Sequence, residues 1–329
     1  MKVAFLSTLN PMLVMFFCIA IGFILKKTNI MSDGASKVTS KLVTWVFAPA
    51  LYFNVTAKFC TPDSIASNAF AVSLGAVVAL LGLGIATALS FAFVRTKSPE
   101  RGVYAYALAF ANLGYVGDPL VLSMFGEQML SVYKMFTLPF SIIIYTWGIG
   151  VLTPSGNGNP LKRLLNAPTI ALLLGVISGL SGVGAYIPSA IGSTLDTLGA
   201  CMGPCAMLTA GFIVASYDFS EMLKNKKVYL ATALRLFVLP TVLVGILFGI
   251  TELIPFVFGI DLGNTVLYLA LFATAAPLGL NTVVFPEAFG GNPKTGASMA
   301  LISHTLCVVT IPIMYTLMTL IFGEIVPMA

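Results

Sequence analysis

Long runs of apolar residues are the feature of this sequence that most restricts its fold. The runs at residues 5–25 and 70–94 contain no charged residue, and each reaches the roughly 20 residues that an α-helix needs to cross a bilayer. Continuous runs favour helices, because the strands of a membrane barrel alternate between apolar and polar residues. In lipid, a spanning helix satisfies its own backbone hydrogen bonds. The sequence therefore predicts an all-α polytopic membrane protein.

The composition agrees with this prediction and excludes other classes. Hydrophobic residues make up 58% of the chain and charged residues 9%, whereas roughly a quarter of an average soluble domain is charged. The net charge of +5 comes from basic residues in small groups between the apolar runs, so no nucleic-acid partner is expected. The five cysteines lie mostly inside apolar runs and predict neither a disulfide framework nor a metal site. No cofactor is expected either.

Polar or Gly/Pro-rich breaks divide the chain into ten predicted spans. The longest hydrophilic connection is residues 153–166, which leaves no room for a domain outside the membrane. The first run is expected to remain as a span, because no strongly basic leader precedes it and Lys26 and Lys27 follow it. The ten predicted spans are residues 5–25, 37–57, 67–94, 102–125, 130–153, 167–186, 190–216, 227–251, 264–288 and 295–323.

Basic residues gather at alternate connections between these spans. The opposite connections contain only Lys58 and Lys134, in addition to Lys2 at the start. By the positive-inside rule the richer set is cytoplasmic, which places both termini on the non-cytoplasmic side of the cell membrane. An even number of spans requires both termini to lie on the same side, which agrees with this placement. The richer set consists of Lys26, Lys27, Lys37, Lys41, Arg95, Lys97, Arg101, Lys162, Arg163, Lys224, Lys226, Lys227 and Lys294.

The two halves of the chain resemble each other with an offset of 162 residues. Each copy contains five spans, and an odd number forces the copies into opposite orientations across the bilayer. Inverted repeats are a signature of secondary transporters, although channels and other folds carry them too. The sequence therefore predicts two inverted five-helix repeats. The matching pairs are Tyr106 and Tyr268, Phe110 and Phe272, and Gly117 and Gly279.

The fourth and ninth spans are interrupted near their middle, by NLGYVGDP at residues 112–119 and by PLGLN at residues 277–281. Proline removes a backbone donor and clashes with the preceding turn, while glycine tolerates unwound backbone. Such backbone survives in a membrane only where protein buries it or where it lines a watered cavity. We expect the two breaks to cross and to present half-helix N-termini, which attract an anion. Two proline-kinked packing helices are the alternative.

Two motifs at these breaks identify a family resemblance. The stretch NLGYVGDPLVLSMFG at residues 112–126 resembles the fourth-span motif of the auxin efflux carrier family, which includes plant PIN-type carriers and bacterial malate or malonate permeases. AAPLGLNTVVFPEAFGGNP at residues 275–293 resembles the ninth-span crossover of that family. Weaker similarity extends over the whole chain, and the short connections are more similar to those of the bacterial permeases.

The resemblance implies a ten-helix fold with two functional parts. Spans 1, 2, 6 and 7, in residues 1–57 and 167–216, would form a scaffold that also makes a homodimer. Spans 3–5 and 8–10, in residues 67–153 and 227–323, would form a mobile transport domain. The implied activity is transport of small organic anions by an elevator movement of this domain.

The predicted crossing supplies the candidate substrate-binding residues. An amide such as that of Asn112 donates to a carboxylate without the cost of burying a cation, and the resemblance implies that this motif position binds the carboxylate of the substrate. The alternative is a structural Asn that caps unwound backbone. Asn281 is a weaker candidate, because it aligns with Pro119. The predicted set is Asn112, Gly114, Tyr115, Gly117, Pro119, Pro277, Gly279 and Asn281.

Three ionisable residues are candidates for ion or proton coupling. Asp118 stands where the family usually has an apolar residue; it is either a proton carrier or cation ligand or, slightly favoured, an N-cap followed by Pro119 at the first helical position. Arg235 is expected to neutralise an anion, to pair with Asp118 or to snorkel to the interface. His304, the only histidine, is either a proton relay or a packing residue.

Three other functions are alternatives to a carrier of organic anions. A sodium-coupled bile-acid-type symporter shares the crossed broken helices, but should carry more acidic and amide ligands there than Asn112, Asp118 and Asn281. A passive channel would differ in showing no saturation and no counterflow. Asp118 and Asp218 only superficially resemble the paired aspartates of intramembrane proteases, and no HExxH, P-loop or GxSxG motif is present. An enzyme is not expected, whereas the substrate, the direction and coupling to H⁺ or Na⁺ are left open.

Overall fold

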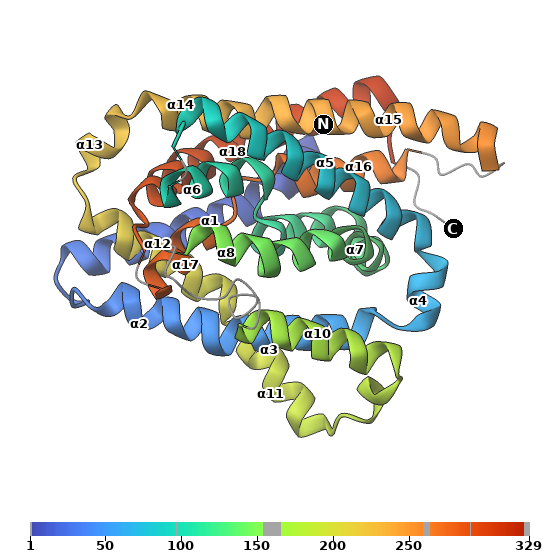
Figure 1. Ribbon diagram of the computed structural model, residues 1–329, viewed down its shortest axis with the longest axis horizontal. Helices are drawn as coiled ribbons and strands as arrows, with labels where there is room; N and C mark the ends of the chain where they lie inside the picture. Colours follow the sequence, from blue (N-terminus) through green and yellow to red (C-terminus); the bar gives the residue numbers. More distant parts are fainter. Residues whose placement is uncertain (1, 97, 154–165, 259–263, 290, 326–329) are drawn as a thin grey trace.

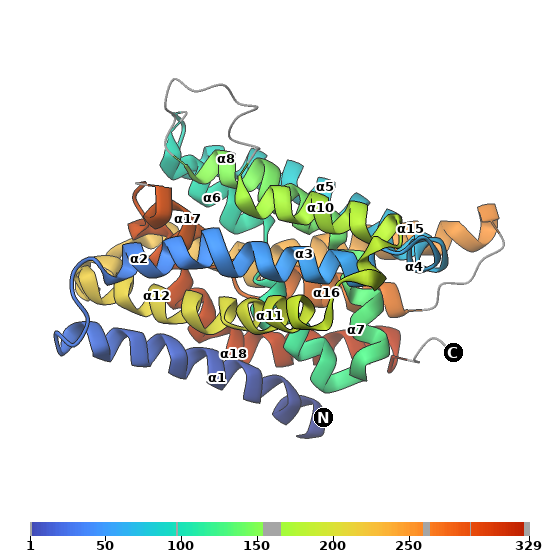
Figure 2. The same ribbon diagram turned by 90° about the horizontal axis from the view of Figure 1, so that it is seen from below.

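The computed structural model describes residues 2–96, 98–153, 166–258, 264–289 and 291–325. In these ranges the regular elements are helices, and an isolated β-bridge joins Ala111 to Leu278. Most of the long helices run side by side along the long axis of the molecule (Figures 1 and 2). The predicted all-α fold is confirmed for the described residues.

Each predicted span overlaps helical residues, and the eighth, predicted to end at residue 251, continues to Phe258. In the first half these are α1 (Lys2–Lys27), α2 (Ala35–Leu42), η1 (Val43–Phe47), α3 (Ala48–Phe59), α4 (Pro62–Ser67), α5 (Ala69–Phe93), α6 (Pro99–Ala109), η2 (Leu113–Gly117), α7 (Asp118–Ile143), η3 (Ile144–Gly148) and α8 (Ile149–Leu152). In the second half they are α10 (Ala167–Leu180), η4 (Val183–Tyr186), α11 (Ser189–Ala200), α12 (Met202–Ser216), α13 (Phe219–Lys224), α14 (Lys226–Ala233), η5 (Leu234–Val238), α15 (Leu239–Phe258), α16 (Thr265–Ala275), α17 (Asn281–Phe289) and α18 (Lys294–Phe322).

Five helical stretches among the described residues are long and apolar enough to cross a membrane. Two of them include π-helical turns, η2 and η3 in one and η5 in the other, that continue directly into an α-helix. Their number and composition support a polytopic membrane protein. The five stretches are Ala69–Phe93, Leu113–Leu152, Ser189–Ser216, Lys226–Leu253 and Lys294–Phe322.

Polar residues in the connections determine where several helices begin. The Ser98 side chain accepts a hydrogen bond from the Arg101 amide at 3.3 Å, and Pro99 occupies the first helical position of α6. Similarly, Asn166 accepts from the Thr169 amide at 3.0 Å at the start of α10. Such caps satisfy backbone donors that a helix start leaves free. The polar breaks seen in the sequence therefore correspond to real helix boundaries.

Within α7, Gly126 separates the fourth and fifth predicted spans. Its φ of 81° and ψ of −175° interrupt the helical geometry, and glycine adopts this conformation without a Cβ clash. The two parts of α7 therefore change direction at Gly126. This reversal brings residues that are far apart along α7 close together in space.

Glycines allow very close contact within one group of helices. A Cβ on Gly22 of α1 would lie 2.3 Å from the Leu208 carbonyl oxygen of α12, and one on Gly175 of α10 would lie 2.5 Å from the Phe53 carbonyl oxygen of α3. Small residues at such positions let helix backbones pack closely in a membrane. These contacts join α1 to α12 and α10 to α3, which belong to predicted spans 1, 7, 6 and 2.

A second group of helices is joined in the same way. A Cβ on Gly75 of α5 would lie 1.9 Å from the Phe136 carbonyl oxygen of α7, and one on Gly296 of α18 would lie 2.3 Å from the Thr282 carbonyl oxygen of α17. These pairs belong to predicted spans 3 and 5, and 10 and 9. Figure 1 shows α2, α3, α10 and α11 along one edge of the molecule and α5, α14 and α15 along the other.

The first helix break differs from its prediction. The non-helical backbone lies at Phe110 (φ −119°, ψ 125°) and Asn112 (φ −79°, ψ 72°), whereas residues 113–117 are wound into the π-helical turn η2. The break was expected to continue to Pro119. It is shorter because the wide π-turn accommodates Gly114 and Gly117 and leads directly into α7. The second break is observed close to its predicted position, at residues 276–280 between α16 and α17.

Candidate functional site

The two breaks meet and form backbone hydrogen bonds with each other. The Asn112 amide donates to the Pro277 carbonyl at 2.7 Å, and the Gly279 amide donates to the Phe110 carbonyl at 3.1 Å. In a membrane, unwound backbone requires such internal partners. The two expected breaks are therefore in contact with each other, and this contact is called the crossing.

Each break is followed by a helix whose N-terminal end lies at the crossing. One of these helices is η2 continued by α7, and the other is α17, which begins at Asn281. The first amides of a helix have no intrahelical acceptor, and the aligned peptide dipoles make this end positive. The crossing therefore combines two helix ends that favour a negatively charged ligand.

A cavity opens directly at this crossing. The volume of the cavity is about 60 Å³, which is several times the volume that a single water requires. Leu51, Tyr52, Val55, Thr56 and Phe59 of α3 form one wall. The crossing and the neighbouring helices supply the other lining residues: Cys60, Ala111, Asn112, Leu113, Gly114, Tyr115, Asp118, Lys134, Met135, Thr137, Leu138, Ser141, Ile144, Tyr145, Met202, Gly279, Leu280 and Asn281.

The Asn112 side chain is held by His304. Asn112 is 3% and His304 1% exposed. His304 Nδ1 lies 2.8 Å from the Ala300 carbonyl oxygen, and His304 Nε2 lies 3.3 Å from Asn112 Nδ2. A carbonyl only accepts, so in the neutral ring Nδ1 carries the proton and Nε2 accepts from the Asn112 amide. His304 thus orients Asn112, a role that lies outside both sequence interpretations of this histidine.

Asn281 has a different partner. Its Nδ2 donates to the Tyr106 hydroxyl oxygen at 2.9 Å. Across the cavity, the rings of Tyr52 and Tyr145 lie 4.2 Å apart between centroids. The buried Tyr115 hydroxyl has no hydrogen-bond partner among the described residues. Aromatic rings with polar edges therefore surround the crossing.

Asp118 is not a helix cap, which corrects the favoured sequence interpretation. Its backbone is helical (φ −59°, ψ −54°) and continues the preceding π-turn, so no helix begins there that needs a cap. Its carboxylate instead forms an ion pair with Lys134 of the same long helix. Both side chains are only 18% exposed. Lys134 was not predicted for the site, although it was one of the few basic residues on the non-cytoplasmic side of the predicted topology.

Arg235 forms no ion pair with Asp118 and does not line the cavity. It is 1% exposed, and its guanidinium donates to the Leu108 carbonyl at 3.4 Å. This carbonyl belongs to the last turn of α6, where helical carbonyls lack partners and a cation is favoured. The structure therefore contradicts both the pairing with Asp118 and the snorkelling of Arg235 to the interface.

The structure brings most of the predicted binding residues together. Asn112, Gly114, Tyr115, Gly279 and Asn281 line the cavity, as does Asp118. Gly117, Pro119 and Pro277 do not line it, and neither do Arg235 and His304. Gly117 instead lies against Tyr133, whose hydroxyl would be 2.2 Å from a Cβ at that position.

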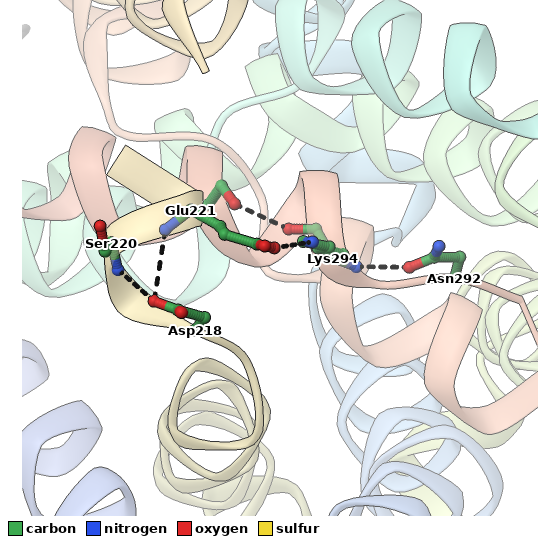
Figure 3. Close-up of polar contacts among 6 residues, drawn as sticks. Asp218, Ser220, Glu221, Asn292 and Lys294 are labelled. Atoms are coloured by element: carbon green, nitrogen blue, oxygen red, sulfur yellow. Dashed lines mark hydrogen bonds and ion pairs between the residues drawn. The ribbon is translucent and has the colours of Figure 1, made fainter. Parts of the chain in front are cut away.

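A second polar region connects helices at the predicted cytoplasmic ends (Figure 3). Asp218 caps α13 by accepting from the amides of Ser220 at 2.8 Å and Glu221 at 3.4 Å. Glu221 pairs with Lys294 at 2.9 Å, and Asn292 accepts from the Lys294 amide at 2.9 Å. Because Asp118 and Asp218 have separate partners, nothing in their contacts resembles two catalytic aspartates that share a proton.

Among the described residues, no group of three or more His, Cys, Asp or Glu side chains is arranged to hold a metal ion. The polar atoms at the crossing come from backbone amides, two side-chain amides, tyrosines and the Asp118–Lys134 ion pair.

Broken helices that meet at a cavity are typical of secondary transporters. Comparison with known proteins agrees: the membrane transport protein family matches residues 7–162 and 158–315. An "uncharacterized transporter" of Methanothermobacter thermautotrophicus is 23% identical over 251 residues, which cover 74% of this chain and 79% of the relative. Another from Methanocaldococcus jannaschii is 23% identical over 211 residues, which cover 62% and 68% of the two chains. The chain belongs to the membrane transport protein family, and the resemblance stated from the two motifs is confirmed.

Proposed function

We propose that this protein is a secondary or facilitative carrier of small organic anions, whose carboxylate binds at the crossing of the two broken helices. Membership of a transporter family supports carriage across a membrane, and it argues against an enzyme. The crossing supports the choice of ligand, because it combines two helix N-termini with the amide of Asn112. The size of the cavity favours a small ligand.

The observation on which the proposal depends is the pair of backbone hydrogen bonds between the breaks. They join Asn112 to Pro277 and Gly279 to Phe110. These bonds use backbone groups upstream of each new helix. Within the first turns, the Leu113 amide donates to the Ala111 carbonyl and the Thr282 amide to the Gly279 carbonyl. The attraction for an anion therefore depends on the positive helix ends and on the Gly114 and Asn281 amides at the cavity. Two independent proline kinks would not require this mutual pairing.

We further propose the architecture that the sequence predicts, with ten spans in two inverted repeats. Residues 1–57 and 167–216 would form the dimeric scaffold, and residues 67–153 and 227–323 the moving transport domain. The close glycine contacts within each group of helices are consistent with this division. The cavity is lined by α3 and Met202 on one side and by the crossing and α7 on the other, as an elevator mechanism requires. Both termini would face the non-cytoplasmic side of the cell membrane.

The direct test is equilibrium binding of carboxylic acids to the purified protein. Asn112→Ala should weaken binding of any acid that stabilises the wild type, while the melting temperature without ligand stays close to that of the wild type. Asn68→Ala is the matched control, since the Asn68 side chain makes only local contacts with Ser64 and Ser67. Equal affinity of Asn112→Ala and wild type would contradict the proposed site.

Transport in proteoliposomes distinguishes the remaining alternatives. A carrier should show saturable uptake of the same acid and counterflow, whereas a channel should show neither. Uptake that requires sodium would favour the bile-acid-type symporter instead. Hydrolysis of a peptide or ester without transport would contradict the proposal altogether.

A further inference from the structure

The Asp118–Lys134 ion pair lies in the wall of the cavity. Lys134 Nζ contacts Asp118 Oδ2, and each side chain is 18% exposed. The two residues are 16 positions apart on α7, and the reversal at Gly126 brings them together. In the other ion pairs among the described residues, Lys26–Asp33 and Lys294–Glu221, the carboxylate side chain is at least 61% exposed. Only this pair therefore combines low exposure of both partners with access to the cavity.

The surroundings of Asp118 contain no other full charge in the cavity lining. The residues that α3, η2, η3, α12 and α17 contribute to this lining are uncharged. Tyr52 of α3 and Tyr133 of α7 are close enough to interact electrostatically with Asp118. Arg235 of η5 is near Tyr133 but does not line the cavity. Lys134 is therefore the one cation among the residues that line the cavity, and it is already paired with Asp118.

A substrate carboxylate at the crossing must compete with Asp118 for Lys134. If Lys134 turned to the substrate while Asp118 stayed ionised, a buried negative charge would lose its partner, which is strongly unfavourable. Uptake of one proton by Asp118 removes this penalty and leaves the Lys134 ammonium free. Two charge states of the cavity thus follow, and both are electrically neutral overall.

We propose that the Asp118–Lys134 pair is a proton-coupled receptor for monocarboxylates, an inference that rests on the proposed anion transport. Without substrate, the Asp118 carboxylate neutralises the Lys134 ammonium. With substrate, a proton converts Asp118 to the carboxylic acid, and Lys134 donates its hydrogen bond to the substrate carboxylate. One proton and one monoanion enter the cavity together, so the movement of the loaded domain is electroneutral. A dianion would leave one negative charge uncompensated.

The test measures binding of propionate and benzoate to the purified full chain at neutral pH and at a mildly acidic pH where both acids remain ionised. Wild-type affinity should rise by up to about tenfold per unit of pH decrease, because binding takes up a proton. Calorimetry in buffers of different ionisation enthalpy should count about one proton per acid bound. Succinate should bind more weakly than propionate.

Variants separate the two members of the pair. Asp118→Asn should bind propionate equally at both pH values, with an affinity like that of the acidified wild type. Lys134→Met should bind it weakly at both. Asp63→Asn and Lys41→Met, which change exposed residues away from the cavity, should keep the wild-type pH dependence. Melting temperatures without ligand identify any variant that fails to fold. In that case proton uptake by the wild type, measured by the calorimetric count, decides the question.

Four results would overturn the inference. Wild-type binding that is independent of pH, or Asp118→Asn with the wild-type pH dependence, would contradict proton coupling while leaving anion transport intact. Tighter binding of glycine than of propionate, lost in Asp118→Asn, would show that the pair recognises a zwitterion. If no acid binds the wild type at either pH, the proposed function fails together with this inference.

Discussion

The two helix breaks are joined by backbone hydrogen bonds but differ in their side chains. The first break contains Asn112 and leads through a π-turn to the charged Asp118. The second break contains Pro277 and Gly279 and lacks any charge, and Asn281 bonds to a tyrosine hydroxyl. The backbone bonds between them are reciprocal. We infer that the second break supports the crossing, whereas the first recognises the ligand.

The largest expected difference concerns the two amides. Asn112→Ala should reduce the affinity for a bound carboxylate by about ten- to a hundredfold, since a hydrogen bond to a charged group contributes about 1.5–3 kcal/mol. Asn281→Ala should reduce it much less, because Asn281 donates to Tyr106 of α6 and so helps to hold the crossing together instead of binding the ligand. Calorimetric titration of both variants checks this order. Equal losses would show that the two breaks contribute symmetrically.

The next difference concerns the two glycines. A Cβ on Gly279 would lie 3.4 Å from the Ala111 carbonyl oxygen, whereas one on Gly114 would meet nothing closer than Asp118 Oδ2 at 3.8 Å. Gly279→Val should therefore overpack the crossing and destabilise the protein by about 1–3 kcal/mol, while Gly114→Ala should leave its stability nearly unchanged. Thermal unfolding in detergent measures both. A stable Gly279→Val protein would contradict the tight second break.

A smaller effect is expected from His304, which acts only through Asn112. His304→Ala removes the acceptor for the Asn112 amide, so affinity should fall by about two- to tenfold, the worth of a typical hydrogen bond. His304→Gln offers a side-chain carbonyl oxygen to the same amide and should recover part of the loss. A packing role alone would affect stability without this recovery of affinity.

The smallest effect is expected far from the crossing, at the Glu221–Lys294 pair (Figure 3). These side chains are 61% and 41% exposed, and exposed pairs contribute little and are screened by salt. Lys294→Met should lower the melting temperature slightly at low ionic strength and not at high ionic strength. It should leave carboxylate affinity unchanged. A loss of affinity would instead connect this region to the cavity.

The positions of the helices could be predicted from the sequence, because apolar runs and their polar boundaries follow directly from the bilayer. The crossing could be anticipated too, since proline and glycine mark both breaks. The ion pair of Asp118, in place of a helix cap, could not be predicted. An Asp-Pro pair indicates a helix start, but the π-turn before it already continues the helix and frees the carboxylate for another partner.

That partner, Lys134, depends on the reversal at Gly126, whose geometry no local pattern specifies. The only sequence signal was a basic residue on the side that the positive-inside rule leaves poor in them. For Arg235 the sequence suggested a partner that the structure does not show. Its charge suggested Asp118, but the free carbonyls at the end of α6 provide a partner that sequence spacing does not reveal.

The most direct test of the account is a structure of the purified protein in lipid nanodiscs with a bound carboxylic acid selected by the binding screen. We predict that the carboxylate lies at the crossing, within hydrogen-bonding distance of the Asn112 side chain and of the backbone amides of Gly114 and Asn281. An acid bound elsewhere, with the crossing unchanged and unliganded, would contradict the central claim.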